Sequence, residues 1–448
     1  MRIRTGFTSS STGSILMITV FLGIVIGFVL ISTLSLVNSQ NQSVVRSQAW
    51  NNCIPVIEAG IEEAMAHLNN KKETSFAVNG WVQSGDTYSR FRALDESFYV
   101  VRIILSNVFQ PVIVCTGYVR APLLFANPGW AAAGVDFGGV QYIPRAVEVV
   151  AKRQPIFIRG MVARQRINMN GNGIMTDSFD SSDPNHSTPL GCYDPAEAMD
   201  NGDVCTTSGG NNIIGVGNAD VKGRLRTGAG GTVILGPGST VGSLAWHAAG
   251  NFGIQPGWST DDMNVYFPPV ERPFNGGAFS PTSGTVTGST YKYLLTGGNY
   301  EMSSLTLSSS EGIAISNKNV LLVNGDVTIN GSIHILPGGS LELYVGGNTA
   351  SLGGPGINNT GQATNFIYYG LQSNQNLILP SNGDFTGAIY APNADLKLSG
   401  GGSALLNFSG ACVVQNIIVN GHYKFHFDEA LRMFGPWTDY VITSWIEL

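Results

Sequence analysis

The chain has 448 residues, enough for two or three domains with buried cores. Its formal net charge of −6 is mild and spread along the chain, which argues against a nucleic-acid-binding protein. Charged residues make up only 12% of the sequence and glycine reaches 57 residues, a composition typical of short β-strands joined by glycine turns.

The first predicted element is a membrane-spanning helix. Residues 15–37 are almost wholly apolar, and no charge interrupts the chain between Arg4 and Arg46. A helix of about 20 such residues crosses the ~30 Å hydrocarbon layer of a bilayer. A cleavable secretory signal is the alternative, but its apolar region is shorter and ends at small residues that do not follow Val37. The positive-inside rule then predicts a cytoplasmic N-terminus, with the rest of the chain outside.

Two glycines within this span, Gly23 and Gly27, form a GxxxG pattern that allows a second helix to approach closely. Beyond the span, apolar residues continue at helical spacing and share one face. These residues are Ile54, Ile57, Ile61, Ala64, Met65 and Leu68. We expect Glu58, Glu62 and Glu63 to point mostly away from that face. Pro55 predicts a kink or local break near residues 51–55.

The N-terminal region resembles a known family. A short polar leader ends at Gly13, the apolar helix begins directly, and the amphipathic helix carries the sequence EAGIEEA at residues 58–64. This order resembles the PilX-type N-terminal region of type IV pilus minor-pilin-like proteins, over roughly residues 5–68. The resemblance implies that a prepilin peptidase cuts between Gly13 and Ser14. One position departs from the pattern of major pilins, which carry a glutamate where Ile18 stands.

The same resemblance implies where the protein works. Residues 1–13 would be the leader, and residues 14–72 the transmembrane and amphipathic helix that contacts other pilin-like subunits. The protein would cross the bacterial inner membrane once, with its bulk in the periplasm or on the cell surface.

Residues 73–155 change to a strand pattern. A helix packed on an antiparallel sheet buries the apolar faces of both, so we predict a small α+β unit like a pilin head. The expected strands are Tyr88–Phe91, Ser97–Leu105, Pro111–Val119 and Ala146–Ala151.

Residues 156–431 are a series of short β runs separated by Asn-Gly and Gly-Gly pairs, most clearly over residues 320–345. Such short strands cannot each bury a face alone, but they can as stacked rungs of a right-handed parallel β-helix. A β-sandwich is the alternative, and it would favour longer strands with polar and apolar residues in alternation.

This region carries a second resemblance, to an uncharacterised bacterial surface domain that ends solenoid-like regions, often behind PilX-type N-termini. The matching segments are DSFDS at residues 177–181, GDFTGAIYAPNAD at 383–395, FSGACVV at 408–414 and GHYKFHFDEAL at 421–431. No catalytic role is attached to that family, so the resemblance implies no active site.

Three aspartates, Asp177, Asp180 and Asp183, could gather on a calcium ion, because clustered carboxylate oxygens suit hard cations. The alternative is that they form ordinary turns. No other cofactor is predicted. Cys192 and Cys205 are close in a loop-rich region and could form a disulfide, with Cys53 and Cys115 as a second possible pair.

A second polar cluster contains His426, Asp428 and Glu429. His426 and Asp428 alternate with phenylalanines, as on a strand with one buried face, so a metal or acid–base site is conceivable. We favour a structural role, in which this strand and the helical turn after it form a C-terminal cap over the open end of the β-helix. Residues 432–448 would be a tail that lies back on the body or contacts a partner.

Catalysis is not expected. Glycosidases need two carboxylates about 5–9.5 Å apart, and acidic residues are sparse and unpaired between Asn319 and Tyr423. The tyrosines in the region could stack on sugars or belong to the core. They are Tyr344, Tyr368, Tyr369 and Tyr390.

The sequence therefore predicts a structural, non-catalytic subunit of a type IV pilus or pseudopilus, with adhesion as a further role. The first alternative is a signal-anchored β-helix protein that binds surface polysaccharide and never enters a filament. The second is an enzyme acting on polysaccharide.

Overall fold

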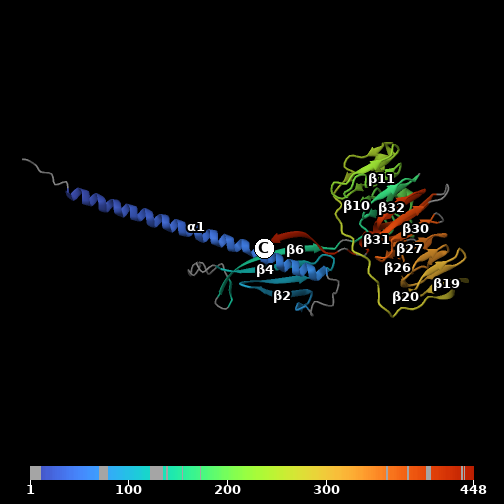
Figure 1. The fold of residues 1–448 in the computed structure, drawn as a ribbon, viewed down its shortest axis with the longest axis horizontal. Helices are drawn as coiled ribbons and strands as arrows, with labels where there is room; N and C mark the ends of the chain where they lie inside the picture. The colour runs from blue at the N-terminus through green and yellow to red at the C-terminus, as the bar shows by residue number, and fades with distance from the viewer. Residues whose placement is uncertain are drawn as a thin grey trace, which may run out of the picture. The chain divides into compact units, whose positions relative to one another are not determined.

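The computed structural model describes two compact units, which can be followed by colour in Figure 1. Unit 1 contains the chain up to Arg153 together with residues 439–448, and unit 2 contains residues 154–438. The last ten residues, which the sequence interpretation treats as part of a tail, therefore belong to unit 1. The described residues are 12–69, 79–121, 135–137, 140–153, 155–171, 173–359, 362–380, 383–399, 405–434, 437 and 439–448.

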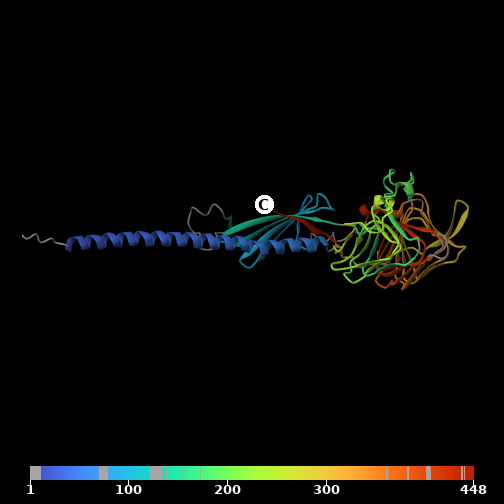
Figure 2. The ribbon, with the colours of Figure 1, turned by 90° about the horizontal axis from the view of Figure 1, so that it is seen from above.

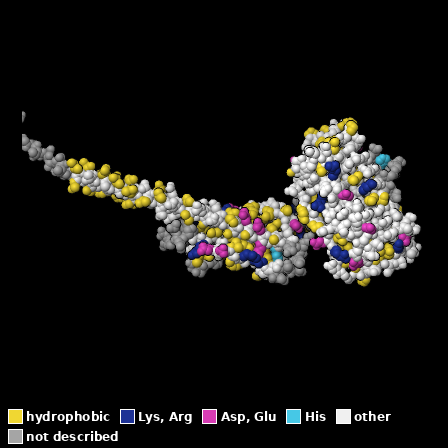
Figure 3. All heavy atoms as spheres, viewed as in Figure 1, with side chains coloured by type: hydrophobic (Ala, Val, Ile, Leu, Met, Phe, Trp, Pro, Cys, Tyr) yellow, Lys and Arg dark blue, Asp and Glu magenta, His cyan; other side chains and the backbone are white. Residues whose placement is uncertain are grey.

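The longest element is helix α1 (Thr12–Asn69), which has 58 residues. Its N-terminal part is apolar and exposed, as Figure 3 shows, and it is long and apolar enough to cross a membrane. The predicted local break at Pro55 is wrong, because α1 continues through this residue. Val56 and Ile57, which follow it, are buried against the sheet of unit 1, and this packing outweighs the missing backbone hydrogen bond.

Unit 1 contains a seven-stranded antiparallel sheet that includes all four predicted strands. Its main path runs in the order β1-β2-β3-β4-β6-β34, and β5 pairs with β6. The C-terminal tail forms β34, which lies beside β6, so unit 2 is inserted between two neighbouring strands of this sheet. The strands are β1 (Val82–Ser84), β2 (Thr87–Leu94), β3 (Ser97–Ile104), β4 (Val112–Arg120), β5 (Val135–Phe137), β6 (Val140–Lys152) and β34 (Val441–Glu447).

The second half of α1 packs along one face of this sheet (Figure 2). The predicted apolar face of the helix supplies Ile57, Ile61, Ala64 and Leu68 to the core of unit 1. Gly60 permits the close approach, because a Cβ atom there would lie 2.5 Å from the Cys115 Sγ atom.

Unit 2 is built from short strands, and 22 of them form one sheet in which every recorded register is parallel. The first group is β7 (Met161–Ala163), β8 (Ile167–Met169), β9 (Met175–Phe179), β10 (Val204–Thr206), β11 (Ile214–Gly217), β12 (Asp220–Lys222), β13 (Leu225–Arg226), β14 (Val233–Leu235), β15 (Thr240–Gly242), β16 (Gly253–Ile254) and β17 (Ser259–Thr260). The second group is β20 (Gly298–Met302), β21 (Leu305–Leu307), β23 (Lys318–Val323), β24 (Val327–Ile329), β26 (Ser340–Val345), β27 (Thr349–Leu352), β29 (Phe366–Gly370), β30 (Asn376–Pro380), β31 (Phe385–Ser399), β32 (Leu406–Val419) and β33 (Tyr423–Asp428).

Five further strands of unit 2 form a smaller sheet in the order β18-β19-β22-β25-β28. The first two are an antiparallel hairpin and the other pairings are parallel. The strands are β18 (Thr282–Val286), β19 (Ser289–Leu295), β22 (Gly312–Ile315), β25 (Ser332–Ile335) and β28 (Ile357–Asn359).

The order of strands in the large sheet differs from their order along the chain. One column of paired strands runs β20-β23-β26-β29-β31-β32-β7-β10-β13-β17. The strands β7 to β17 form a first arm and the strands β20 to β33 form a second arm, and both arms advance in the same direction. The chain therefore enters the middle of the stack at β7 and winds to one end at β17. It then crosses to the other end at β20 and winds back to the middle at β33.

This order shows that the predicted C-terminal cap is wrong. Strand β33 pairs with β32 on one side and with β9 on the other, so it lies within the stack and not over an open end. The cap was expected because a terminal strand in a simple solenoid has one free edge. Here the first arm occupies that edge.

A segment that we name the strap, residues 261–281, connects the two arms and crosses the stack, with contacts near both of its ends. The Met263 amide donates to the Thr227 carbonyl over 2.9 Å, and the Tyr390 hydroxyl donates to the Pro268 carbonyl over 2.5 Å. The strap places buried side chains of Met263, Phe267 and Val270 in the core of unit 2. It therefore ties the start of the second arm to strands near the middle of the stack.

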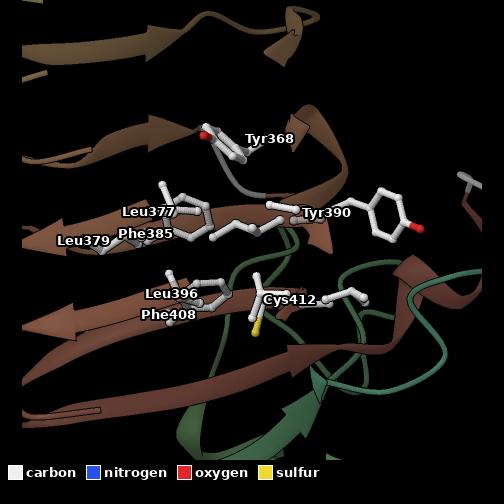
Figure 4. Packing of buried hydrophobic residues seen from close by; sticks show 14 of the residues in the cluster. Tyr368, Leu377, Leu379, Phe385, Tyr390, Leu396, Phe408 and Cys412 are labelled. Carbon is white, nitrogen blue, oxygen red and sulfur yellow. The ribbon is translucent and has the colours of Figure 1, made fainter. Parts of the chain in front are cut away.

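Inward side chains stack on their counterparts in the next strand. Figure 4 shows this packing for Leu377, Phe385 and Phe408 among others. The ring centroids of Phe385 and Phe408 are 4.6 Å apart, and those of Phe408 and Phe425 are also 4.6 Å apart. The strands of the stack thus share one continuous core.

The inward and outward positions of β24 give a direct test of this core. Ile329 is buried and pairs with inward Leu307 and Leu352, whereas its neighbour Thr328 is exposed. We expect Ile329→Asp to lower the stability of unit 2 by about 3–5 kcal/mol, because it buries an unpaired charge. Thr328→Asp is the matched control and should change stability little. Hydrogen–deuterium exchange of peptides from β23 to β27 would measure both, and equal protection in the two variants would contradict the inward assignment.

Candidate functional site

The densest group of buried polar side chains in unit 2 lies where the two arms meet. We name it the closing seam and define it by residues of β9, β32, β33, the loop after β9 and the turn after β33. Its members are Asp177, Ser178, Tyr193, Asn407, His426, Asp428 and Glu429. Strand β33 brings His426 directly opposite Asp177 of β9.

His426 and Asp177 are at the centre of the closing seam, and both are fully buried. The His426 Nδ1 atom lies 2.5 Å from Asp177 Oδ1, and His426 Nε2 lies 3.1 Å from Asn407 Oδ1. The Tyr193 hydroxyl donates to Asp177 Oδ2 over 2.7 Å, and its ring stacks on the imidazole with centroids 3.5 Å apart. Burial, aided by the Asp177 charge, raises the pKa of Tyr193, which keeps the hydroxyl a donor.

A carboxylate paired with an imidazole resembles an acid–base pair, but this arrangement joins strands. Both ring nitrogens of His426 already have partners, and Tyr193 covers one face of the ring. Neither His426 nor Asp177 has exposed surface on which a substrate could react. The contacts instead connect β9, β32, β33 and the loop that carries Tyr193.

The other two residues of the predicted cap hold the turn after β33. The Asp428 carboxylate accepts from the amides of Ser181 and Ala430 over 3.0 and 3.2 Å, which caps the short helix η6 (Glu429–Met433). Burial raises the pKa of Asp428 to about 6. Glu429 accepts from Ser178 and Asn201, each over 2.8 Å, so it links β33 to the start of the first arm.

The three aspartates proposed as calcium ligands do not converge. Asp177 belongs to the closing seam, Asp180 accepts from Ser182, and Asp183 accepts from Asn185. The last two contacts are local side-chain-to-backbone turns, which was the alternative considered for these residues. Within the described ranges, no three His, Cys, Asp or Glu side chains are placed to hold a metal ion.

The predicted disulfide between Cys192 and Cys205 is absent, and both thiols are free, as are those of Cys53 and Cys115. Cys205 is fully buried in β10, between β7 and β13, whereas Cys192 lies in the loop after β9 and is partly exposed. The two residues are close in sequence, but the side chain of Cys205 faces the core whereas Cys192 lies in a surface loop. Their thiols are therefore not paired.

Three of the four tyrosines considered for sugar stacking are buried, and the fourth, Tyr344, is partly buried against the core of unit 2. Tyr344 and Tyr369 stack with centroids 4.4 Å apart, and Tyr390 follows in the same column, beneath the strap. Tyr369 and Tyr390 are buried, and Tyr368 points into the core. These residues belong to the packing of unit 2.

In unit 1, the sequence interpretation missed an anchoring residue. Glu63 was expected to point mostly away from the sheet, but it forms ion pairs with Arg90 and Arg92 of β2 and accepts from the Tyr99 hydroxyl of β3. Burial, and the neighbouring Glu63 carboxylate, raise the pKa of Tyr99. Two arginines at alternate positions of one strand were the available signal for this contact.

Residues predicted to act at the membrane lie in the first half of α1. Gly13 and Ser14 fall in its first turn, and residues 1–11 of the leader lie outside the described part of the chain. A Cβ atom at Gly23 or Gly27 would have no heavy atom within 4 Å, so this side of the helix is open. Their role in helix packing stays a prediction.

Comparisons with known proteins identify relatives of parts of this arrangement. Residues 274–434 match a family described as Domain of unknown function (DUF7305), which covers the second arm but neither unit 1 nor the first arm. No curated protein sequence matches the chain. Among solved structures, the chain is similar to the competence-associated pilin ComZ from Thermus thermophilus, with 9% identity and a TM-score of 0.25. That similarity covers 89% of this chain and 98% of ComZ, at a score below that of proteins sharing a fold.

Removing Asp177 tests whether the closing seam holds the arms together. Asp177→Ala leaves the buried Tyr193 hydroxyl and His426 Nδ1 without an acceptor, which should cost about 2–6 kcal/mol in total, at about 1–3 kcal/mol for each group. Asp183→Ala is the control, because it changes an aspartate of the loop after β9 whose carboxylate accepts hydrogen bonds only from Asn185 among the described residues. Hydrogen–deuterium exchange of β9 and β33 peptides should rise in the first variant only, and unchanged exchange would contradict the structural role.

Asp428 predicts a pH dependence of stability. Because its pKa rises from about 4 in the unfolded chain to about 6 in the folded chain, the folded state binds more protons between these values. The contribution of this carboxyl group to the free energy of unfolding therefore falls as pH rises from 4 to 6, by about 2–3 kcal/mol in total. Asp428→Asn keeps the acceptor and removes the titration, so the variant should be more stable than the parent at pH 8 and similar at pH 4. Urea denaturation of both proteins at pH 4 and at pH 8 measures their free energies of unfolding. A difference between the two proteins that is the same at both pH values would contradict this prediction.

Proposed function

We propose that this protein is a pilin-like subunit of a type IV pilus or related pseudopilus, anchored in the bacterial inner membrane. The observation that carries the proposal is the division of α1 into an exposed apolar half and a half that packs on an antiparallel sheet. This division, the leader before it and the PilX-like sequence at residues 58–64 agree with one another.

The exposed half of α1 needs an apolar environment. Residues 15–37 carry long aliphatic side chains with high exposure, such as Leu16 at 69% and Met17 at 78%, and the first buried residue of the described helix is Ala49. Leaving this surface in water is unfavourable by roughly 25 cal/mol for each Å² of apolar area. A bilayer before assembly, and neighbouring helices after it, would supply the environment.

Unit 2 would be a right-handed parallel β-helix displayed outside the membrane. In the second arm, paired residues of successive turns are 20 positions apart for Ile313 and Ile333 and 22 positions apart for Leu321 and Leu343, and strands of both sheets recur along this arm. Right-handedness is expected because crossovers between parallel strands are right-handed in nearly all proteins. We assign this unit a non-catalytic role, because its buried histidine–carboxylate pair joins strands and lacks surface access.

The runner-up is a signal-anchored protein that binds polysaccharide and never enters a filament. Ile18 favours it, because a glutamate at that position aligns subunits in major pilins and the apolar residue cannot. The two functions differ in the fate of the leader, since entry into a filament requires its removal and simple anchoring does not.

Coexpression with a prepilin peptidase tests the proposal. The protein should lose Met1–Gly13 and begin at Ser14, which intact-mass and N-terminal peptide analysis would detect. Protein expressed without the peptidase is one control, and Gly13→Leu, which should block cutting, is the other. A leader that stays intact in the presence of an active peptidase would overturn the pilin proposal and leave the membrane anchor in place.

A further inference from the structure

A shallow groove of about 370 Å³ crosses the outer faces of β8, β11 and β14 in the first arm of unit 2. Its lining includes one cationic side chain, three carboxamides and an exposed aliphatic side chain around a glycine. These residues are Arg166, Asn168, Asn170, Asn212, Ile234 and Gly215. We propose that this groove binds an acidic polysaccharide, a role that goes beyond the proposed subunit function and does not depend on filament assembly.

The groove exists because Gly215 has no side chain. In the register of the sheet, Gly215 lies between Asn168 and Ile234, so three neighbouring strands present one outward position each. A Cβ atom at Gly215 would lie 3.4 Å from Asn168 Oδ1, which is an ordinary contact. Gly217 differs, because its φ is +56° and a Cβ atom there would lie 2.1 Å from the Met169 carbonyl oxygen. The fold therefore requires Gly217, whereas it would accept a side chain at Gly215.

The polar side chains around this glycine have no partners within the described chain. No hydrogen bond or ion pair with a described residue involves the side chains of Arg166, Asn168, Asn170 or Asn212. Elsewhere on unit 2, surface amides are commonly engaged across rungs. Examples are Asn416 with Asp395 over 2.7 Å, Asn324 with Glu301 over 2.8 Å, and Asn393 with Arg164 over 2.9 Å. The groove thus gathers the donors and acceptors that the stack itself does not use.

The polar side chains that line the groove suit a hydroxyl-rich anion. Each carboxamide both donates and accepts, as neighbouring hydroxyl groups of a sugar require, and a guanidinium binds a carboxylate through paired hydrogen bonds. The lining contains no acidic residue, and Ile234, which is 50% exposed, offers apolar surface to the carbon face of a sugar ring.

The outer face continues beyond the groove in a way that fits a polymer. In register, Asn168 is followed by Ile418 of β32 and then by Lys397 of β31, both of which are exposed. Lys397 lies two strand spacings from Asn168, about 10 Å along the stack. Its ammonium group has no partner among the described residues, so an extended anionic chain would meet a second cation there.

Binding of sodium polygalacturonate to the detergent-solubilised full chain tests the inference, with dextran as the neutral comparison. Biolayer interferometry should show saturable binding of polygalacturonate that weakens as salt increases, and little binding of dextran. Gly215→Leu, which fills the groove, and Arg166→Gln, which removes the charge, should each weaken binding about tenfold. For Arg166 this is the effect expected for loss of one charge-assisted contact, and for Gly215 it follows from steric exclusion of the ligand. Thr328→Leu is the control, because Thr328 lies on the same outward column but in the second arm.

Each result decides between clear outcomes. Loss of affinity in both groove variants, with the control and the hydrogen exchange of unit 2 unchanged, supports the inference. Absence of binding, or equal affinity in all three variants, overturns the site. Equal binding of dextran and polygalacturonate overturns the acidic class of ligand. Failure of the leader to be cut bears only on filament assembly, so it leaves this result unaffected.

Discussion

The pairing between the first and last strands of unit 2 is the constraint on which its structure depends. Strands β7 to β9 complete the free edges of β32 and β33, so residues that are 249 positions apart in sequence form hydrogen bonds. Without this pairing each arm would expose an open edge in the middle of the molecule. The strap and the shared core both depend on it, because they connect strands whose neighbours are fixed by the closure.

The closing seam gives this junction its register. Apolar residues that repeat on every rung would pack almost as well if one arm slipped along the other. A slip by one residue would instead move His426 away from Asp177 and leave buried polar groups without partners, which is costly in a low-dielectric interior. Polar contacts therefore select one arrangement among several that hydrophobic burial alone would allow.

Local patterns predicted local structure and little of the long-range order. The apolar run of α1, the four strands of unit 1 and the short strands of unit 2 follow from residue spacing, since each pattern reflects the environment of its own segment. The position of β33 inside the stack does not, because equivalent rungs have similar inward residues and any of them could be neighbours. For the same reason β34 was read as a tail and His426 as part of a cap. Gly215 was missed because a glycine in a glycine-rich sequence predicts a turn, and only the register shows that it opens a groove.

The insertion of unit 2 between β6 and β34 has a consequence for biosynthesis. During synthesis, β6 emerges long before the C-terminal residues that cover its edge, and the Arg145–Glu447 ion pair cannot form until the final residues arrive. A chain that stalls or is clipped anywhere in unit 2 therefore retains an uncovered strand in unit 1. Such edges invite non-native pairing and proteolysis, so only full-length molecules acquire a finished surface on unit 1. The covalent order of the chain thereby makes the finished surface of unit 1 a sign that the whole chain has been made.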